Sequence, residues 1–314
     1  MAWLRLIRYK NLIIIVLLQY LLRYHLLLPI LDHFGVAPAL SHVRFALLVI
    51  ATVCLAASGY AINDYFDIQT DLINRPKKVL VGRTIERRKA LLLHLILTFI
   101  GVFTGFFLAY VSRKENYAVM FLLIPALLWY YSTTFKKQFL VGNLVISLLT
   151  ALVAWVVVSI EFAALSRQLG EGIIQSQACS TAWFWTTGFA FFAFLSNLMR
   201  EIIKDMEDVK GDTNNGCNTL PIALGMRYTK ALVMLLAIFS VVALWSVFAS
   251  VPELNTSVAT AVYFAMAITL PYLFLMWQIR KAHLPRHFHM ASGASKIIML
   301  TGILYIIIAG MFFR

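Results

Sequence analysis

The sequence predicts an all-α integral membrane protein that crosses the bilayer nine times. Of its 314 residues, 61% are hydrophobic and only 13% are charged, and the mean hydropathy is +0.82. A soluble globular protein carries about 25% charged residues. The apolar residues also gather into runs of about 20, which is the length that an α-helix needs to cross the hydrocarbon core of a membrane.

Nine apolar runs account for these crossings, after a basic amphipathic segment at residues 1–10. The fourth run is the shortest and contains Pro125, which weakens a helix. The first run is long for a signal peptide, and no small-residue cleavage site follows it. We expect one polytopic domain over residues 1–314, with two motif-bearing halves at about 1–137 and 138–314. The runs lie near residues 11–31, 44–62, 90–111, 117–133, 140–162, 182–200, 230–251, 256–279 and 295–312.

The distribution of Lys and Arg predicts the orientation of the chain. With a cytoplasmic N-terminus, 21 of the 27 Lys and Arg residues fall in cytoplasmic segments and 5 on the opposite side. This excess is the positive-inside pattern, and it predicts a multi-pass protein of a bacterial-type inner membrane. The same loops, in contact with anionic membrane lipid, account for the net charge of +13, so we expect no nucleic-acid partner. No pattern specifies an oligomeric state.

Three aspartates follow the second apolar run, in the segment NDYFDIQTD. Asp64, Asp67 and Asp71 have the spacing 0, +3, +7, so on a helix they share one face, which we call the first stripe. Like charges on one face destabilise a helix by about 0.2–0.5 kcal/mol per pair, and this arrangement favours a multivalent cation as ligand. Asn63 precedes the stripe and offers a carbonyl ligand, unless it serves as a cap at the helix end.

A second segment, REIIKDMEDVKGD, repeats this arrangement after the sixth apolar run. Glu201 lies on the same face, whereas Glu207 faces away and is assigned a structural role. Eight of the fourteen acidic residues of the chain lie in the two segments. Mg²⁺ prefers oxygen ligands of this kind. We therefore predict that Mg²⁺ and a phosphorylated ligand are held by Asn63, the first stripe and a second stripe made of Asp205, Asp208 and Asp212.

Basic and aromatic residues accompany both stripes. Pro76 ends any helix that continues from the first stripe, so a loop that folds over the site is expected there. An alternative interpretation makes the cations part of the positive-inside excess and the tyrosine part of an aromatic belt. Besides Asn63, the residues predicted to bind the phosphorylated ligand are Arg75, Lys77, Arg83, Tyr131, Lys136 and Lys204.

A Mg²⁺ site beside an apolar membrane interior suits a prenyl diphosphate, which joins an apolar tail to a diphosphate head. Ionisation of its allylic C–O bond yields pyrophosphate and an allylic carbocation. Mg²⁺, Lys and Arg stabilise the charge of the leaving group, and a cavity without water protects the carbocation. The residues therefore predict an enzyme that transfers a prenyl group to a lipophilic acceptor.

Three motifs together resemble the UbiA superfamily of intramembrane prenyltransferases. They are NDYFDIQTD followed by NRP, YSTTFKK with a later Gly-Asn, and KDMEDVKGD with a later TLP. The resemblance covers nearly the whole chain. It implies nine helices around a central cavity, both acidic motifs at the cytoplasmic mouth, and Mg²⁺ bridging the diphosphate. The chain looks most similar to the geranylgeranylglycerol-phosphate geranylgeranyltransferase branch, which implies a prenylated glycerol phosphate as acceptor.

Other functions share parts of this pattern. A quinone-precursor (aromatic) prenyltransferase uses the same diphosphate apparatus. A cation-coupled membrane transporter would use the stripes as ion sites, but it would carry acidic residues near mid-span or broken helices that point at the midplane. The stripes instead lie at the ends of spans, beside a basic loop. A soluble isoprenoid synthase has comparable aspartate motifs, and the nine apolar runs argue against it.

Overall fold

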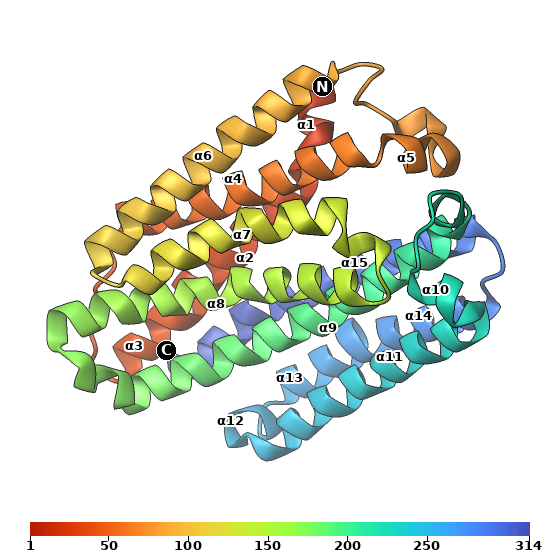
Figure 1. The fold of residues 1–314 in the computed structure, drawn as a ribbon. Coiled ribbons are helices and arrows are strands. Elements are labelled where there is room, and N and C mark those ends of the chain that lie inside the picture. The colour runs from red at the N-terminus through yellow and green to blue at the C-terminus, as the bar shows by residue number, and fades with distance from the viewer.

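The computed structural model describes all 314 residues as a bundle of helices that lie roughly parallel or antiparallel (Figure 1). No β-sheet is present, and the one isolated bridge joins Val81 to Ile85. The long helices are α2 (Tyr9–Leu21), α4 (His42–Phe66), α6 (Arg87–Ser112), α7 (Glu115–Thr133), α8 (Val141–Leu169), α9 (Gln177–Asn214), α11 (Gly225–Ser250), α14 (Leu270–Lys281) and α15 (Pro285–Ala309).

Shorter helices extend or connect these. The short α-helices are α1 (Ala2–Leu6), α3 (Leu28–His33), α5 (Ile68–Asn74), α10 (Leu220–Ala223), α12 (Pro252–Asn255) and α13 (Val258–Tyr263). Single 3₁₀ turns cover Pro76–Lys78, Phe135–Lys137, Glu171–Gln175 and Gly310–Phe313.

Two transmembrane helices contain a π-helical turn, which the sequence analysis does not anticipate. Leu22–Leu27 joins α2 to α3, and Phe264–Thr269 joins α13 to α14. Each turn ends two residues before a proline, Pro29 or Pro271. A proline inside a helix leaves the carbonyl four residues earlier without its donor, and its ring crowds that carbonyl. A wider turn on the N-terminal side relieves this conflict while the helix continues.

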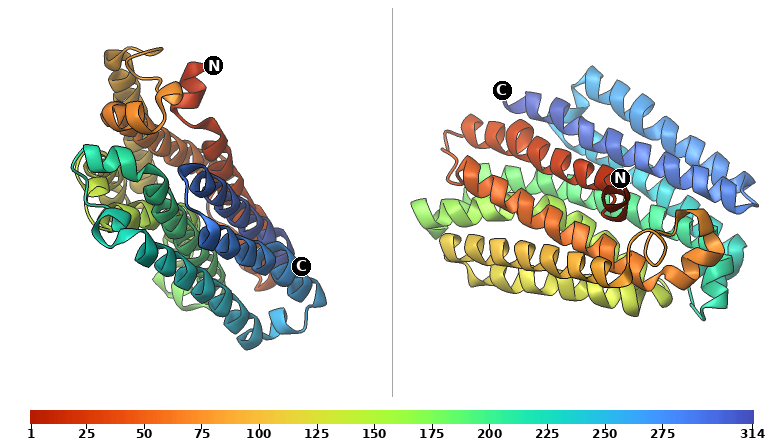
Figure 2. Two further views of the ribbon diagram at one scale, coloured as in Figure 1. Left: turned by 90° about the vertical axis from the view of Figure 1, so that its right-hand side faces the viewer. Right: turned by 90° about the horizontal axis from the view of Figure 1, so that it is seen from above.

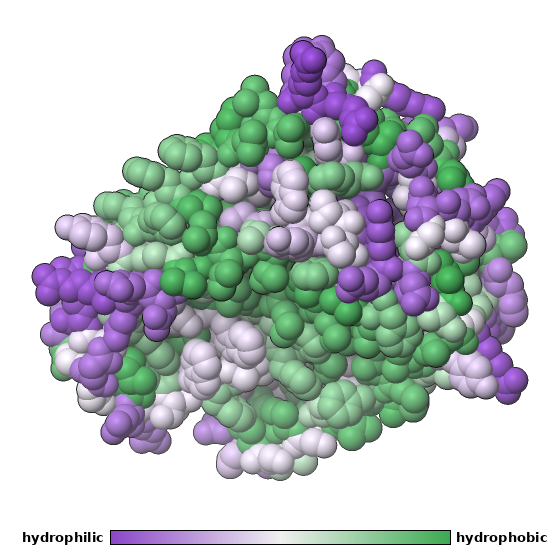
Figure 3. Space-filling view, viewed as in Figure 1, coloured by the Kyte–Doolittle hydropathy of each residue, from purple (hydrophilic) through white to green (hydrophobic).

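Every predicted apolar run lies in a helix, and eight helical segments are long and apolar enough to cross a membrane. The remaining helix, α7, has 19 residues, begins with Glu-Asn and ends with Tyr-Tyr-Ser-Thr. Its apolar centre is therefore short, and the count of nine crossings stays a prediction. Figure 3 shows a broad apolar band with hydrophilic residues gathered toward its ends, as a multi-pass membrane protein requires.

The helices share one buried core. A single cluster of 51 buried side chains draws on helices from α2 to α15, so the bundle packs as one unit. A separate small cluster lies where α1 meets the loop after α5, and it contains Leu6, Ala61, Val81, Ile85 and Ala90. This cluster fixes the N-terminal segment against the loop that follows the first stripe.

A buried ion pair secures the end of the bundle opposite to the acidic stripes. Arg23 is 1% exposed and donates to Glu161 Oε2 at 2.6 Å and to the carbonyl of Leu40. Glu161 Oε1 accepts from the backbone N–H groups of Ala39 and Leu40 at 2.7 and 3.0 Å. A charge in the membrane interior is tolerated when its partner and hydrogen bonds are present, as here. The connection between α3 and α4 is thereby tied to α8.

The arrangement of the helices makes the predicted orientation testable. α5 and α10 lie at the same end of the bundle (Figures 1 and 2), and Asn215 donates to Thr70 at 3.0 Å across this end. A reporter fused near Arg83 or Asn214 should therefore read cytoplasmic, and one near Gln168, at the end of α8, should read external. Reporters at Arg83 and Asn214 that read opposite sides would contradict both the orientation and a common site.

Candidate active site

The first stripe crosses a break in the helix, which the sequence analysis treats as continuous. α4 ends at Phe66, Asp67 adopts φ −86° and ψ 3°, and α5 begins at Ile68. Asp67 stands both at the C-terminal end of α4 and at the N-terminal end of α5, so the two helix dipoles act on its carboxylate in opposite senses. The Asp67 N–H still donates to the Asn63 carbonyl at 2.9 Å, and the Asp71 N–H donates to the Asp67 carbonyl at 2.8 Å. The backbone hydrogen bonds of the helix therefore continue across the break, and the three aspartates remain in one nearly continuous helical segment.

Two cationic groups from other segments and one amide from α4 itself contact the first stripe. Arg8 donates to Asp64 Oδ1 at 2.9 Å, and its guanidinium lies over the ring of Tyr60. Arg8 itself has φ +51°, and this left-handed turn between α1 and α2 is strained for a residue other than glycine. The ammonium of Lys136 pairs with Asp67 Oδ1, and Asn63 Nδ2 donates to Asp67 Oδ2 at 2.7 Å.

The second stripe lies on α9, which continues without a break from Gln177 to Asn214. Asn143 at the start of α8 donates to Asp205 Oδ2 at 2.8 Å. Arg75 donates to both carboxylate oxygens of Asp208 at 2.9 and 2.8 Å, and it lies 3.1 Å from Glu207. Glu207 thus contacts a cation of the site, although its place on the helix predicts a structural role.

Hydrogen bonds between α5 and α9 bring the two stripes together. The side chain of Asn74 accepts from the Gly211 N–H at 2.8 Å and donates to the Asp208 carbonyl at 3.1 Å. Burial, followed by the neighbouring charges of Asp67 and Asp64, raises the pKa of Asp71 to about 6. Asp208 of the second stripe also contributes to this effect. Carboxylates from both segments therefore share one electrostatic environment.

Close packing at Gly211 offers a test of this junction. A Cβ built at Gly211 would lie 2.4 Å from the Asn74 side chain, whereas one at Gly188 on the same helix would meet nothing within 4 Å. We expect Gly211→Ala to destabilise the junction by about 1–3 kcal/mol and to reduce activity. Gly188→Ala is the matched control. Thermal unfolding and turnover that are the same in the two variants would contradict the importance of the junction.

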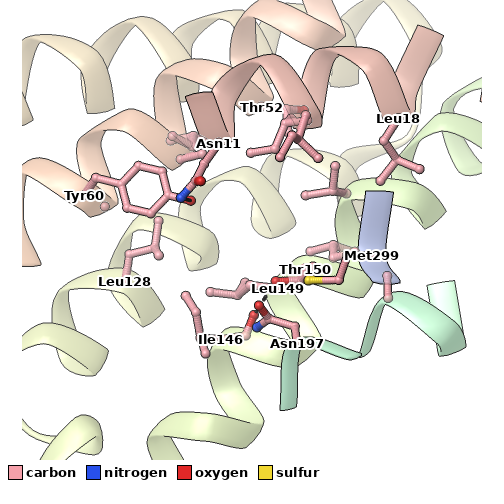
Figure 4. Close-up of a pocket in the computed structure, with 18 of the residues that line it drawn as sticks. Asn11, Leu18, Thr52, Tyr60, Leu128, Ile146, Leu149, Thr150, Asn197 and Met299 are labelled. Atoms are coloured by element: carbon pink, nitrogen blue, oxygen red, sulfur yellow. Dashed lines mark hydrogen bonds between the residues drawn. The ribbon is translucent and has the colours of Figure 1, made fainter. Parts of the chain in front are cut away.

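A mostly apolar cavity extends from this site into the bundle. Of its 33 lining residues 21 are hydrophobic, and Leu18, Leu128, Leu149 and Met299 point into it (Figure 4). Asn11 donates to the Tyr60 hydroxyl at 3.3 Å on the wall formed by α2 and α4. At the polar end the lining includes Asn63, Tyr131, Lys204, Arg8, Arg200, Glu201 and Lys296. Asn63 belongs to both the cavity and the first motif, whereas the six aspartates lie outside the lining.

The donor set suits a hard divalent cation such as Mg²⁺. All the acidic ligands are oxygen donors, and Asn63 Oδ1 is buried without a hydrogen-bond partner, which is a free carbonyl oxygen of the kind that Mg²⁺ accepts. No three acidic, His or Cys side chains converge as a metal-binding group in this structure. Asp64, Asp67 and Asp208 are instead paired with Arg and Lys side chains. The assignment of individual metal ligands stays a prediction.

The structure separates the basic residues that the sequence groups together. Arg75 and Lys136 contact the aspartates, and Lys204 contacts Glu201 at the cavity. Lys77 is exposed without an ion pair or hydrogen bond, and Arg83 donates to the Pro76 carbonyl at 2.7 Å. Neither contacts a carboxylate of the two stripes.

Some contacting residues carry no predicted role in the sequence analysis. Asn143 is the asparagine of the Gly-Asn that follows YSTTFKK, and Asn74 begins NRP, so both stand in motifs already noted. Arg8, Arg200 and Lys296 appear only as members of the cytoplasmic excess of basic residues. Their placement in the cavity depends on how the helices pack.

Comparison with known proteins identifies the family. Residues 26–293 match the UbiA prenyltransferase family. The chain belongs to this family. Its fold also agrees with a UbiA homolog from Aeropyrum pernix in the apo state, with a TM-score of 0.63, 18% identity, and coverage of 92% of this chain and 96% of the other. A UbiA homolog from Archaeoglobus fulgidus bound to DMAPP and Mg²⁺ matches with a TM-score of 0.55, 17% identity and coverage of 98% and 99%.

Several curated relatives of this UbiA family member share one name. A digeranylgeranylglyceryl phosphate synthase from Sulfurisphaera tokodaii is 33% identical over 60% of each chain. The synthase of that name from Korarchaeum cryptofilum is 27% identical over 83% of this chain and 84% of its own length. The chain thus spans about 60% of the first relative. A structure described as digeranylgeranylglyceryl phosphate synthase in membranes is 22% identical, with a TM-score of 0.59 over 99% and 98% of the chains.

Proposed function

We propose that this protein is a Mg²⁺-dependent intramembrane prenyltransferase, which transfers a prenyl group from a prenyl diphosphate to a lipophilic acceptor and releases pyrophosphate. The observation that carries the proposal is the meeting of two aspartate stripes, from α4–α5 and α9, beside the polar end of an apolar cavity that Asn63 and Lys204 line. The apolar cavity suits the prenyl chain, and the charged end suits its diphosphate. The Archaeoglobus homolog with DMAPP and Mg²⁺ supports the donor and the metal.

Different residues of the chain would bind the diphosphate and the prenyl chain of the donor. Bound Mg²⁺, held by Asn63 and the aspartates, would neutralise the diphosphate. Lys136 and Arg75 are placed to stabilise the charge that grows on pyrophosphate as it takes the electron pair of the C–O bond. The apolar walls exclude water from the allylic carbon. The acceptor hydroxyl then forms the new C–O bond to that carbon, and its proton passes to the released pyrophosphate.

For the acceptor we propose a glycerol phosphate that already carries a prenyl chain. The names of the curated relatives support this choice. A quinone precursor is the second candidate, since the same aspartate stripes serve any prenyl diphosphate. A cation-coupled transporter is disfavoured because both stripes lie at one end of the bundle, beside the basic segment Arg75–Lys89.

The decisive experiment uses the full-length protein purified in detergent with Mg²⁺, labelled prenyl diphosphates and a panel of acceptors. We expect labelled lipid from prenylated glycerol phosphate, equimolar pyrophosphate, and loss of both products after chelation of Mg²⁺. If labelled lipid formed only with an aromatic acceptor, the aromatic compound and not the glycerol phosphate would be the acceptor. If the folded protein transferred the prenyl group to none of the acceptors, the result would contradict the proposal that it is a prenyltransferase.

A further inference from the structure

A group of cationic side chains lines the cavity separately from those that contact Asp67 and Asp208. Arg8, Arg200, Lys204 and Lys296 come from the start of α2, from α9 and from α15. Arg200 lies eight residues before Asp208 on α9, so at 1.5 Å per residue it sits about 12 Å along the helix axis from the Arg75 contact. We call these four residues the inner cationic cluster.

The inner cationic cluster has fewer carboxylate partners than cations. Arg8 pairs with Asp64 at 2.9 Å. Arg200 and Lys204 share Glu201 Oε1 at 2.9 and 2.6 Å, and Glu201 is 8% exposed. Lys296 is exposed and contacts only a neutral amide, the Asn11 Oδ1, at 3.2 Å. Four cations thus face two carboxylates, which leaves a surplus of two positive charges.

The cluster also contains an unused hydrogen-bond donor. Arg200 Nε is buried and has no acceptor, and the Arg200 side chain is 13% exposed. A buried donor without an acceptor is costly in an apolar surrounding, so it indicates a ligand that supplies the acceptor. A phosphate monoester carries about −1.5 to −2 charge at neutral pH and three strong acceptor oxygens. Its charge matches the surplus, and its oxygens match the free donors.

We infer that the inner cationic cluster is the binding site for the phosphate monoester of the acceptor, with Arg200 and Lys296 as its principal contacts. This inference rests on the proposed function, because it assigns a place to the acceptor of that reaction. Glu201 holds Arg200 and Lys204 in position without neutralising the cluster. The acceptor phosphate and the donor diphosphate then have separate sets of cations along α9. A neutral aromatic acceptor would leave the surplus charge without a partner.

The test compares Arg200→Gln and Lys296→Met with Lys210→Gln, which alters an exposed cation of α9 outside the cavity. Acceptors are the prenylated glycerol phosphate and the same lipid without its phosphate. We expect each cluster variant to raise the KM of the phosphorylated acceptor by about ten- to a hundredfold. The KM of the prenyl diphosphate should change by less than about twofold. With the unphosphorylated lipid the variants should match the wild type, because the interaction is already missing.

Several results would overturn the assignment. An increase in the KM of the prenyl diphosphate instead of the acceptor would assign the cluster to the donor. An unchanged KM for both substrates in Lys296→Met and Arg200→Gln would contradict the proposed site. If Arg200→Gln fails to fold, Lys296→Met still provides this test. Calorimetric binding of the phosphorylated lipid without any donor separates this inference from the proposed function. Phosphate-dependent binding that the variants lose would support the site even if no prenyl transfer were observed.

Discussion

Replacing Asp67 or Asp208 with asparagine should reduce prenyl transfer by about a thousandfold or more. Each residue belongs to a different stripe, and the two stripes meet through Asn74 and Gly211. Bound Mg²⁺ would neutralise the leaving diphosphate only if carboxylates held it, and an asparagine supplies no charge for this purpose. The measurement is turnover of labelled prenyl diphosphate at saturating Mg²⁺, with thermal unfolding in detergent as the test of folding.

Asparagine is chosen because it separates a metal ligand from a structural contact. In Asp208→Asn the amide oxygen still accepts a hydrogen bond from Arg75, and in Asp67→Asn it still accepts one from Lys136. If the aspartates served only to hold these cations, the asparagine variants would keep most of the activity and alanine variants would lose it. Asp32→Asn, at an exposed position in α3, is the control for removal of a carboxylate. Retained activity in either site variant would contradict a joint site.

The sequence predicts the secondary structure of the membrane part well. Each apolar run lies in a helix because a segment in lipid must satisfy its own backbone hydrogen bonds, and length and hydropathy reveal such segments directly. The break at Asp67 and the two π-helical turns are local exceptions. The turns stand before Pro29 and Pro271. Pro125 lies inside α7 without such a turn, so a proline in an apolar run does not by itself predict one.

The sequence locates the chemistry of the site less completely. Periodicity along one helix identifies the aspartates that share a face, and this part is visible in a single segment. The partners of those aspartates come from far away in the chain: Arg8 is 56 residues from Asp64, and Arg75 is 133 residues from Asp208. Helix packing decides these pairs, and no spacing within a segment encodes it. The positive-inside excess also hides functional cations among those that set the topology.

Lys136 is the basic residue for which activity should depend most clearly on the leaving group. Its ammonium pairs with Asp67 and is 16% exposed, whereas the neighbouring Lys137 is exposed. An interaction that strengthens as the C–O bond breaks lowers kcat more than it weakens binding. We expect Lys136→Ala to reduce kcat by about ten- to a thousandfold, the scale seen when one preorganised donor is removed. Lys137→Ala should retain nearly full activity.

The acceptor dependence of this loss distinguishes the role of Lys136 from that of the inner cationic cluster. Every acceptor shares the same leaving group, so kcat with Lys136→Ala should fall equally for all of them while the KM of each acceptor stays unchanged. A loss confined to one acceptor would move Lys136 to the acceptor site. Equal activity of Lys136→Ala and Lys137→Ala would indicate that both lysines serve only to set the membrane topology. The contact between Lys136 and Asp67 would then be an ion pair without a part in the reaction, because removing a cation that stabilises the departing pyrophosphate must slow its departure.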